Sequence, residues 1–194
     1  MLKFRICGIN FGVSILFPAA LIVMFTLDPG SLTVWCTAAS LMHEAGHFLA
    51  IYAFGHKPSA IRAGIFGVCV VQNPHIPASS VESMIISLSG PAVNAASFAI
   101  IYFTVGMTSA AIVHLTLAVF NLLPVESLDG GQALFHLLTI FTKEKTASRT
   151  VTVVSVIVLL PLAAAGFYIL IKSGYNFTLL AVSIYLCLLL ILRQ

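Results

Sequence analysis

Six apolar runs constrain this chain more than any other feature of its sequence. A helix needs about 20 apolar residues to cross the hydrocarbon core of a bilayer, which is about 30 Å thick. Hydrophobic residues make up 60% of the 194 residues and charged residues only 8%, against about 25% charged residues in a soluble domain. The sequence therefore predicts an all-α polytopic membrane protein with six transmembrane helices, at about 6–27, 32–54, 83–105, 108–123, 150–171 and 176–192.

The first run argues for a retained span rather than a cleaved signal peptide. It is about 22 residues long, whereas the apolar region of a signal peptide has 7–15 residues. No polar block long enough for a soluble domain is present, so we expect residues 1–194 to form a single integral membrane domain in the lipid bilayer. The basic residues are scattered rather than clustered, which excludes nucleic acid as a partner.

The distribution of lysine and arginine predicts the orientation, because cytoplasmic loops carry an excess of both. With the N-terminus inside, only Lys172 of the nine basic residues lies outside. We therefore expect both termini in the cytoplasm, on the side that holds the other eight: Lys3, Arg5, Lys57, Arg62, Lys143, Lys145, Arg149 and Arg193.

Residues 43–47, His-Glu-Ala-Gly-His, fit the pattern H-E-x-x-H inside the second run. On a helix, residues i and i+4 share a face, so His43 and His47 can bind one metal ion while Glu44 contacts a metal-bound water. A zinc ion lowers the pKa of that water to about 7, and a glutamate can then accept its proton. His47 lies about seven residues before the cytoplasmic end of the run, or about 10 Å deep, which places the site in the cytoplasmic half of the bilayer. Polar contacts or a proton relay between helices are the alternative.

A catalytic zinc ion needs a third protein ligand. Expected depth excludes His114, which we place near the outer half of the fourth span, and leaves three candidates beyond a proline break: Glu126, Asp129 and His136. Asp129 is preferred because it follows Pro124, and broken backbone at membrane depth is tolerated where it lines a wet cavity. Capping of a short, non-crossing helix over 131–142 is its alternative role.

Two asparagines and one short segment complete the candidate site. Asn94 and Asn121 can donate hydrogen bonds to an oxyanion or hold a substrate backbone, with interhelical hydrogen bonding as the alternative for each. Residues 61–71 are β-branched and punctuated by glycine. They predict a short membrane-dipping β-hairpin, with an irregular cytoplasmic loop as the alternative.

Three motifs occur in order, each in or beside an apolar run: His43-Glu44-Ala45-Gly46-His47, Gly90-Pro91-Ala92-Val93-Asn94, and Phe120-Asn121-Leu122-Leu123-Pro124 running to Leu128-Asp129-Gly130-Gly131. Together they resemble the site-2 protease family of intramembrane zinc metalloproteases, peptidase family M50. The resemblance covers about 31–142, the three-helix catalytic core of that family. It implies zinc held by His43, His47 and Asp129, with Glu44 as the catalytic base and Asn94 and Asn121 holding the substrate.

Members of this family cleave transmembrane or membrane-associated segments of proteins such as sigma-factor precursors and anti-sigma factors. The six-span plan looks most like the bacterial sporulation-type subgroup, which implies a bacterial cell membrane. We expect neither the PDZ domain nor the C-terminal cystathionine-β-synthase-type domain of other members. The resemblance leaves open the substrate, the oligomeric state and a regulatory membrane partner.

Two functions of other classes compete with proteolysis. A membrane metal-ion or proton transporter would use the same His/Glu/Asp cluster, and its signature would be a second polar cluster leading outward, where the sequence offers His114. An inactive relative would bind substrates without cutting them, but Glu44 and Asp129 are both present.

Overall fold

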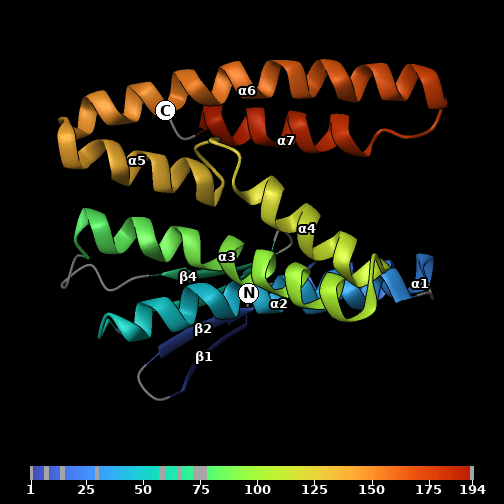
Figure 1. Ribbon diagram of the computed structural model, residues 1–194, viewed down its shortest axis with the longest axis horizontal. Helices are drawn as coiled ribbons and strands as arrows, with labels where there is room; N and C mark the ends of the chain where they lie inside the picture. The colour runs from blue at the N-terminus through green and yellow to red at the C-terminus, as the bar shows by residue number, and fades with distance from the viewer. Residues whose placement is uncertain are drawn as a thin grey trace. The chain divides into compact units, whose positions relative to one another are not determined.

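The structure of the protein is a computed structural model that describes residues 2–6, 9–13, 16–28, 31–56, 60–64, 67–71 and 78–192. Within these ranges the chain forms seven helices and four strands (Figure 1). It divides into two compact units, Met1–Phe120 and Asn121–Gln194. Whether the whole chain behaves as one domain stays a prediction.

The helices of the first unit are α1 (Leu16–Leu27), α2 (Ser31–Ala53), α3 (Ser80–Val105) and α4 (Ser109–Asn121). A capping box starts α3: the Glu82 N–H donates to Ser79 Oγ over 3.2 Å, and the Ser79 N–H donates to the Glu82 carboxylate over 2.7 Å. Gly106 ends α3 at φ 93°, which glycine adopts without steric cost. Helices α2 and α3 pack side by side (Figure 1).

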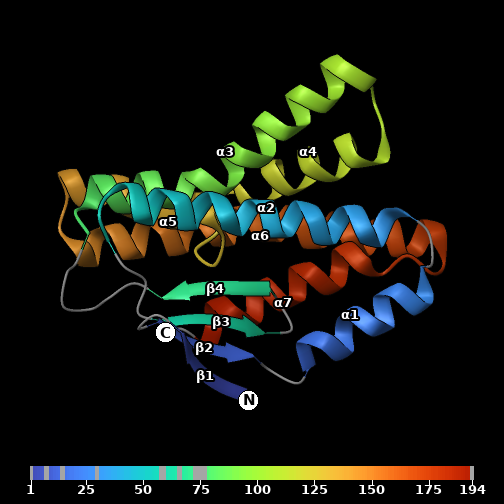
Figure 2. The same cartoon turned by 90° about the horizontal axis from the view of Figure 1, so that it is seen from below.

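A four-stranded sheet belongs to the same unit, and Figure 2 shows its strands as neighbouring arrows. Its strands are β1 (Leu2–Ile6), β2 (Ile9–Val13), β3 (Ala60–Gly64) and β4 (Gly67–Val71), in that order. The β1–β2 and β3–β4 pairs are antiparallel, whereas β2 and β3 are parallel. The hairpin predicted over 61–71 is therefore confirmed as a strand pair, and its outer strand β4 contacts α2.

The helical part of the all-α prediction is confirmed, but the single span predicted over 6–27 is wrong. That run divides into β2 and α1, and the 12 residues of α1 reach only about 18 Å. Hydropathy alone cannot separate an apolar strand from an apolar helix. The glycine and asparagine residues of this run, Gly8, Asn10 and Gly12, lower its helix propensity.

The second unit contains α5 (Asp129–Phe141), α6 (Glu144–Ser173) and α7 (Thr178–Leu192). The short helix predicted over 131–142 is confirmed as α5. Gly174, with φ 74°, ends α6, and α7 then runs back along it (Figure 1). The two helices approach closely at Gly166, where a Cβ atom would lie 2.6 Å from the backbone nitrogen of Leu180.

Two helices among the described residues, α3 and α6, are long and apolar enough to cross a membrane, and α4 and α7 are shorter apolar helices. Helix α2 has 23 residues and a length of about 34 Å, but its central histidines and glutamate lower its hydropathy. Large apolar side chains stay exposed on both units, including Phe103 at 83% and Leu160 at 66%. These exposures suit a lipid environment. Six spans are not confirmed, because the first of them is wrong, and the other five stay predictions.

The substitution Gly166→Val should separate α6 from α7, because the added side chain would overlap the backbone of Leu180. We expect the free energy of unfolding to fall by about 1–3 kcal/mol, measured as a lower thermal midpoint in detergent. Ala164→Val places the same side chain at an exposed position of α6 and is the matched control. Equal midpoints for the two variants would show that this close approach is unimportant.

Candidate metal centre

The H-E-x-x-H pattern lies in the middle of α2, so its helical geometry is confirmed. His43 is buried, and the Nε2 atoms of His43 and His47 are 3.1 Å apart. Two nitrogens bound to one tetrahedral zinc ion at 2.0–2.1 Å are about 3.3 Å apart. The two imidazoles are therefore already close to the spacing that one ion requires. Glu44, the next residue after His43, is half-buried.

A backbone carbonyl determines which nitrogen of His47 carries the proton. His47 Nδ1 lies 2.7 Å from the Ile86 carbonyl oxygen in α3, and a carbonyl can only accept. Nδ1–H is therefore the donor, which leaves the lone pair of Nε2 directed toward His43. Metal-binding histidines in proteins are oriented in this way.

Gly90 of α3 makes room for both imidazoles. A Cβ atom at this position would lie 2.8 Å from His43 Nε2 and closer still to His47 Nε2. The first residue of the Gly90-Pro91 motif is thus small because the nitrogens that face a metal lie against its Cα. The lack of a side chain here, together with the donor set, fits a metal ion.

Asn94, four residues after Gly90, links three helices. Its side chain is completely buried, with Nδ2 3.1 Å from His43 Nδ1 in α2 and Oδ1 3.0 Å from His114 Nδ1 in α4. The structure thus brings His43, His47 and Asn94 together in the first unit, as the sequence predicts. Asn94 makes interhelical hydrogen bonds, the alternative role that we considered for it.

His114 corrects the depth argument that excluded it. It is 3% exposed and stands two hydrogen bonds from His43, not several turns away. Depth alone misled because the Asn94 side chain of α3 bridges the two histidines. The sequence did contain a signal for this contact. His114 lies in an apolar helix, and an ionisable residue there needs a polar partner.

The other predicted residues lie in the second unit. Asn121 ends α4 and begins this unit, and Asp129 is the first residue of α5; both are half-buried. Gly130 and Gly131 let the first turn of α5 lie on the backbone of 122–126. A Cβ atom on Gly131 would overlap the Val125 carbonyl, and one on Gly130 the Leu122 carbonyl. The two glycines therefore determine how α5, with Asp129 at its start, leaves the proline-broken segment.

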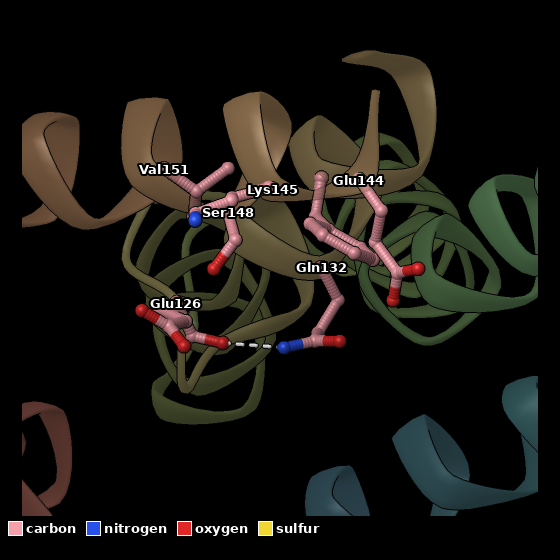
Figure 3. A pocket seen from close by; sticks show the side chains of 7 residues that line it. Glu126, Gln132, Glu144, Lys145, Ser148 and Val151 are labelled. Atoms are coloured by element: carbon pink, nitrogen blue, oxygen red, sulfur yellow. Dashed lines mark hydrogen bonds between the residues drawn. The ribbon is translucent and has the colours of Figure 1, made fainter. Parts of the chain in front are cut away.

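Glu126, a weaker candidate for the third ligand, is held by α6. Its N–H donates to Ser155 Oγ over 2.8 Å, and the Thr152 hydroxyl donates to its carboxylate over 3.0 Å. The Gln132 side chain donates to its carbonyl, the bond drawn in Figure 3. These three bonds anchor the 122–128 segment to α5 and α6. His136, the remaining candidate, lies on α5, where burial lowers the pKa of its imidazole.

A hollow of about 490 Å³ lies beside Glu126 in the second unit (Figure 3). Glu126 and Gln132 line one side, and α6 contributes three charged or polar residues, Glu144, Lys145 and Ser148. Two carboxylates, those of Glu126 and Glu144, and one ammonium group, that of Lys145, are among its lining groups.

Gly90→Ala tests the proposed space for a metal. The added methyl must displace both imidazoles, and we expect zinc affinity to fall at least about tenfold, as when the orientation of metal ligands is disturbed. Competition with a chromophoric chelator measures the affinity. Ala95→Ser adds one heavy atom on an exposed face of the same helix and should bind zinc as the unsubstituted protein does. An undisturbed affinity in Gly90→Ala would remove Gly90 from the site.

Comparison with known proteins brings a match to a family model and matches to solved structures. Residues 107–164 match the family model described as Peptidase family M50. This segment contains His114, Asn121 and Asp129, and it covers less than a third of the chain. No curated protein matches the sequence.

Among solved structures, the fold is similar to that of the site-2 protease from Methanocaldococcus jannaschii. The TM-score is 0.63 at 18% sequence identity, with 95% of this chain and 91% of that chain covered. At this identity the likeness establishes the fold. The family match in sequence and the likeness in fold agree with the resemblance predicted from three motifs, and together they support the site-2 protease family for this chain.

Proposed function

We propose that the protein is an intramembrane zinc metalloprotease that hydrolyses a peptide bond in or near a transmembrane segment of another membrane protein. One observation carries the proposal: two imidazoles on α2 have their Nε2 atoms 3.1 Å apart, and a backbone carbonyl holds His47 in the tautomer that binds a metal. The match to peptidase family M50 and the site-2 protease fold support an intramembrane metalloprotease.

Asp129 is proposed as the third zinc ligand. Two histidines and one carboxylate are a donor set that catalytic zinc sites use, with the fourth position open for water or substrate. The segment that matches the peptidase family contains Asp129. Of the competing residues, Glu126 has its carboxylate hydrogen-bonded to Thr152 of α6, which favours Asp129.

A zinc ion bound there supplies Lewis acidity, which polarises the scissile carbonyl and lowers the pKa of a water to about 7. Glu44 is proposed as the catalytic base. It takes a proton from the water that attacks the carbonyl carbon and gives a proton to the leaving amine nitrogen as the C–N bond breaks. Its position next to His43, offset by about 100° around α2, suits contact with the water rather than with the ion.

A helical substrate segment must become extended before attack, because its carbonyls are engaged in hydrogen bonds. Strand β4 suits the task of holding such a segment, since it is one of the two edge strands of the sheet and contacts α2. We propose that the substrate adds to this edge by β-augmentation, and that Asn121 holds its backbone near the metal.

The substrate class follows from the resemblance to the sporulation-type subgroup. We propose a membrane-associated sigma-factor precursor or an anti-sigma factor as the first substrates to test, in a bacterial cell membrane. The excess of Lys and Arg on one side supports cytoplasmic termini and a site in the cytoplasmic half of the bilayer.

A membrane metal-ion or proton transporter is the second candidate function. The buried chain from His43 through Asn94 to His114 favours it, because it extends the polar cluster away from α2. Reconstitution in liposomes separates the two functions: a transporter moves zinc or protons across the bilayer, whereas a protease cleaves a co-reconstituted substrate and moves neither.

Glu44→Gln tests the catalytic base. The amide keeps the size of the side chain but cannot accept the proton, so we expect zinc to bind as before and cleavage to fall by at least about 100-fold. Cleavage of a co-expressed substrate is followed by immunoblot, and bound zinc by metal analysis of the purified protein. Cleavage at the unsubstituted rate would exclude Glu44 as the base.

Asp129→Ala tests the third ligand against its nearest competitor. Removing one of three ligands should weaken zinc binding by at least about 100-fold, given the 10–100-fold cost of losing only an outer contact. Glu126→Gln, three residues earlier, is the matched control and should retain zinc. If the glutamine variant loses zinc and the alanine variant keeps it, Glu126 rather than Asp129 is the ligand.

A further inference from the structure

Three buried side chains form a polar chain through the first unit: His43 of α2, Asn94 of α3 and His114 of α4. Their exposed fractions are 6%, 0% and 3%. One hydrogen bond joins Asn94 to each histidine, with distances of 3.1 Å and 3.0 Å. Water has little access to any of the three, so the two bonds must be satisfied by these side chains themselves.

The Asn94 side chain faces two ring nitrogens, one of which accepts a hydrogen bond while the other donates one. Its Nδ2 faces His43, and its Oδ1 faces His114. An amide nitrogen only donates and an amide oxygen only accepts. This arrangement therefore requires His43 to accept at Nδ1 and His114 to donate from Nδ1.

Metal binding demands the opposite arrangement. A histidine that binds an ion through Nε2 carries its proton on Nδ1 and donates it to an acceptor. Asn94 can provide that acceptor if its amide turns by 180°, which exchanges oxygen and nitrogen in nearly the same volume. The amide nitrogen then faces His114, which must accept at Nδ1 and carry its proton on Nε2.

We propose that His114 is a positioning residue for the metal centre and acts through Asn94. By accepting a hydrogen bond at Nδ1, it holds the Asn94 oxygen against His43 and so keeps the proton of His43 on Nδ1, leaving Nε2 for zinc. The amide of Asn94 has two hydrogen-bonded orientations, and zinc selects the one with its oxygen toward His43. The inference rests on the proposed function, because it takes His43 to be a zinc ligand.

Substitutions of His114 in the full chain test the proposal by zinc affinity. His114→Phe fills the same space but cannot accept, and we expect zinc affinity to fall by about 10–100-fold, the cost of losing an outer-shell partner. His114→Asn places an amide oxygen near the Nδ1 position and should restore most of that loss. Thr33→Val removes a buried hydroxyl bonded to Asp28 at another point of α2; it should lower the thermal midpoint and leave zinc affinity unchanged.

A second substitution removes the dependence on His114. A carboxylate accepts from His43 in either orientation, so Asn94→Asp needs no partner to hold it. In that background His114→Phe should change zinc affinity by no more than about twofold, the scatter expected for uncoupled sites. If His114→Phe does not fold, His114→Gln replaces it. The glutamine amide extends beyond the Nδ1 position, so this variant should lose as much zinc affinity.

The proton on His43 gives a readout independent of affinity and activity. Nitrogen-15 NMR of the histidine-labelled protein should show His43 protonated on Nδ1 when zinc is added, and His114 protonated on Nε2. If His114→Phe binds zinc as tightly as the unsubstituted protein does, the role of His114 is overturned and the proposed function is not. No zinc binding by the unsubstituted protein overturns the proposed function, and the inference with it.

Discussion

Two imidazoles in one apolar helix, one buried and the other half-buried, are the constraint on which the rest of the first unit depends. An imidazole removed from water must have each ring nitrogen satisfied, and α2 alone cannot do this. Helix α3 supplies the Ile86 carbonyl to His47 and the Asn94 amide to His43. It also contributes Gly90, the one residue type that leaves room for the nitrogens between the two helices. Polar contacts therefore help to determine the packing of α2 on α3 in a chain whose residues are mostly hydrophobic.

Motifs with a fixed spacing on one helix were predictable from the sequence. The 43–47 pattern places both histidines on one face whatever surrounds α2, and the break at Pro124 limits α4 in any fold. The partners of these residues were less accessible, because they depend on how helices pack. Asn94 was identified from its motif, but its contact with His114 joins α3 to α4, and the motifs carry no information about which helices meet. The expected depth therefore excluded His114, although it lies two hydrogen bonds from His43.

The N-terminal region shows the limit of hydropathy. Residues 6–27 are as apolar as a membrane span, yet they form strand β2 and the short helix α1. What distinguishes the two outcomes is pairing with a distant segment, since β2 lies beside β3 rather than continuing as a helix. A composition average carries no information about such a partner. The hairpin of β3 and β4 was predictable because its pairing is local and its β-branched residues and glycines are close together in the sequence.

The parallel pairing of β2 with β3 has a mechanical consequence. Asn10 pairs with Ala60 and Val13 with Ala63, so the strands close a loop that contains α1 and all of α2. The helix with the two histidines thus lies inside a closed ring of chain, with α1 between β2 and α2 and with β3 after α2. A substrate segment that adds to β4, as proposed above, would join the sheet that closes this ring. The edge proposed to hold the substrate and the helix with the two imidazoles would then belong to one closed stretch of the chain.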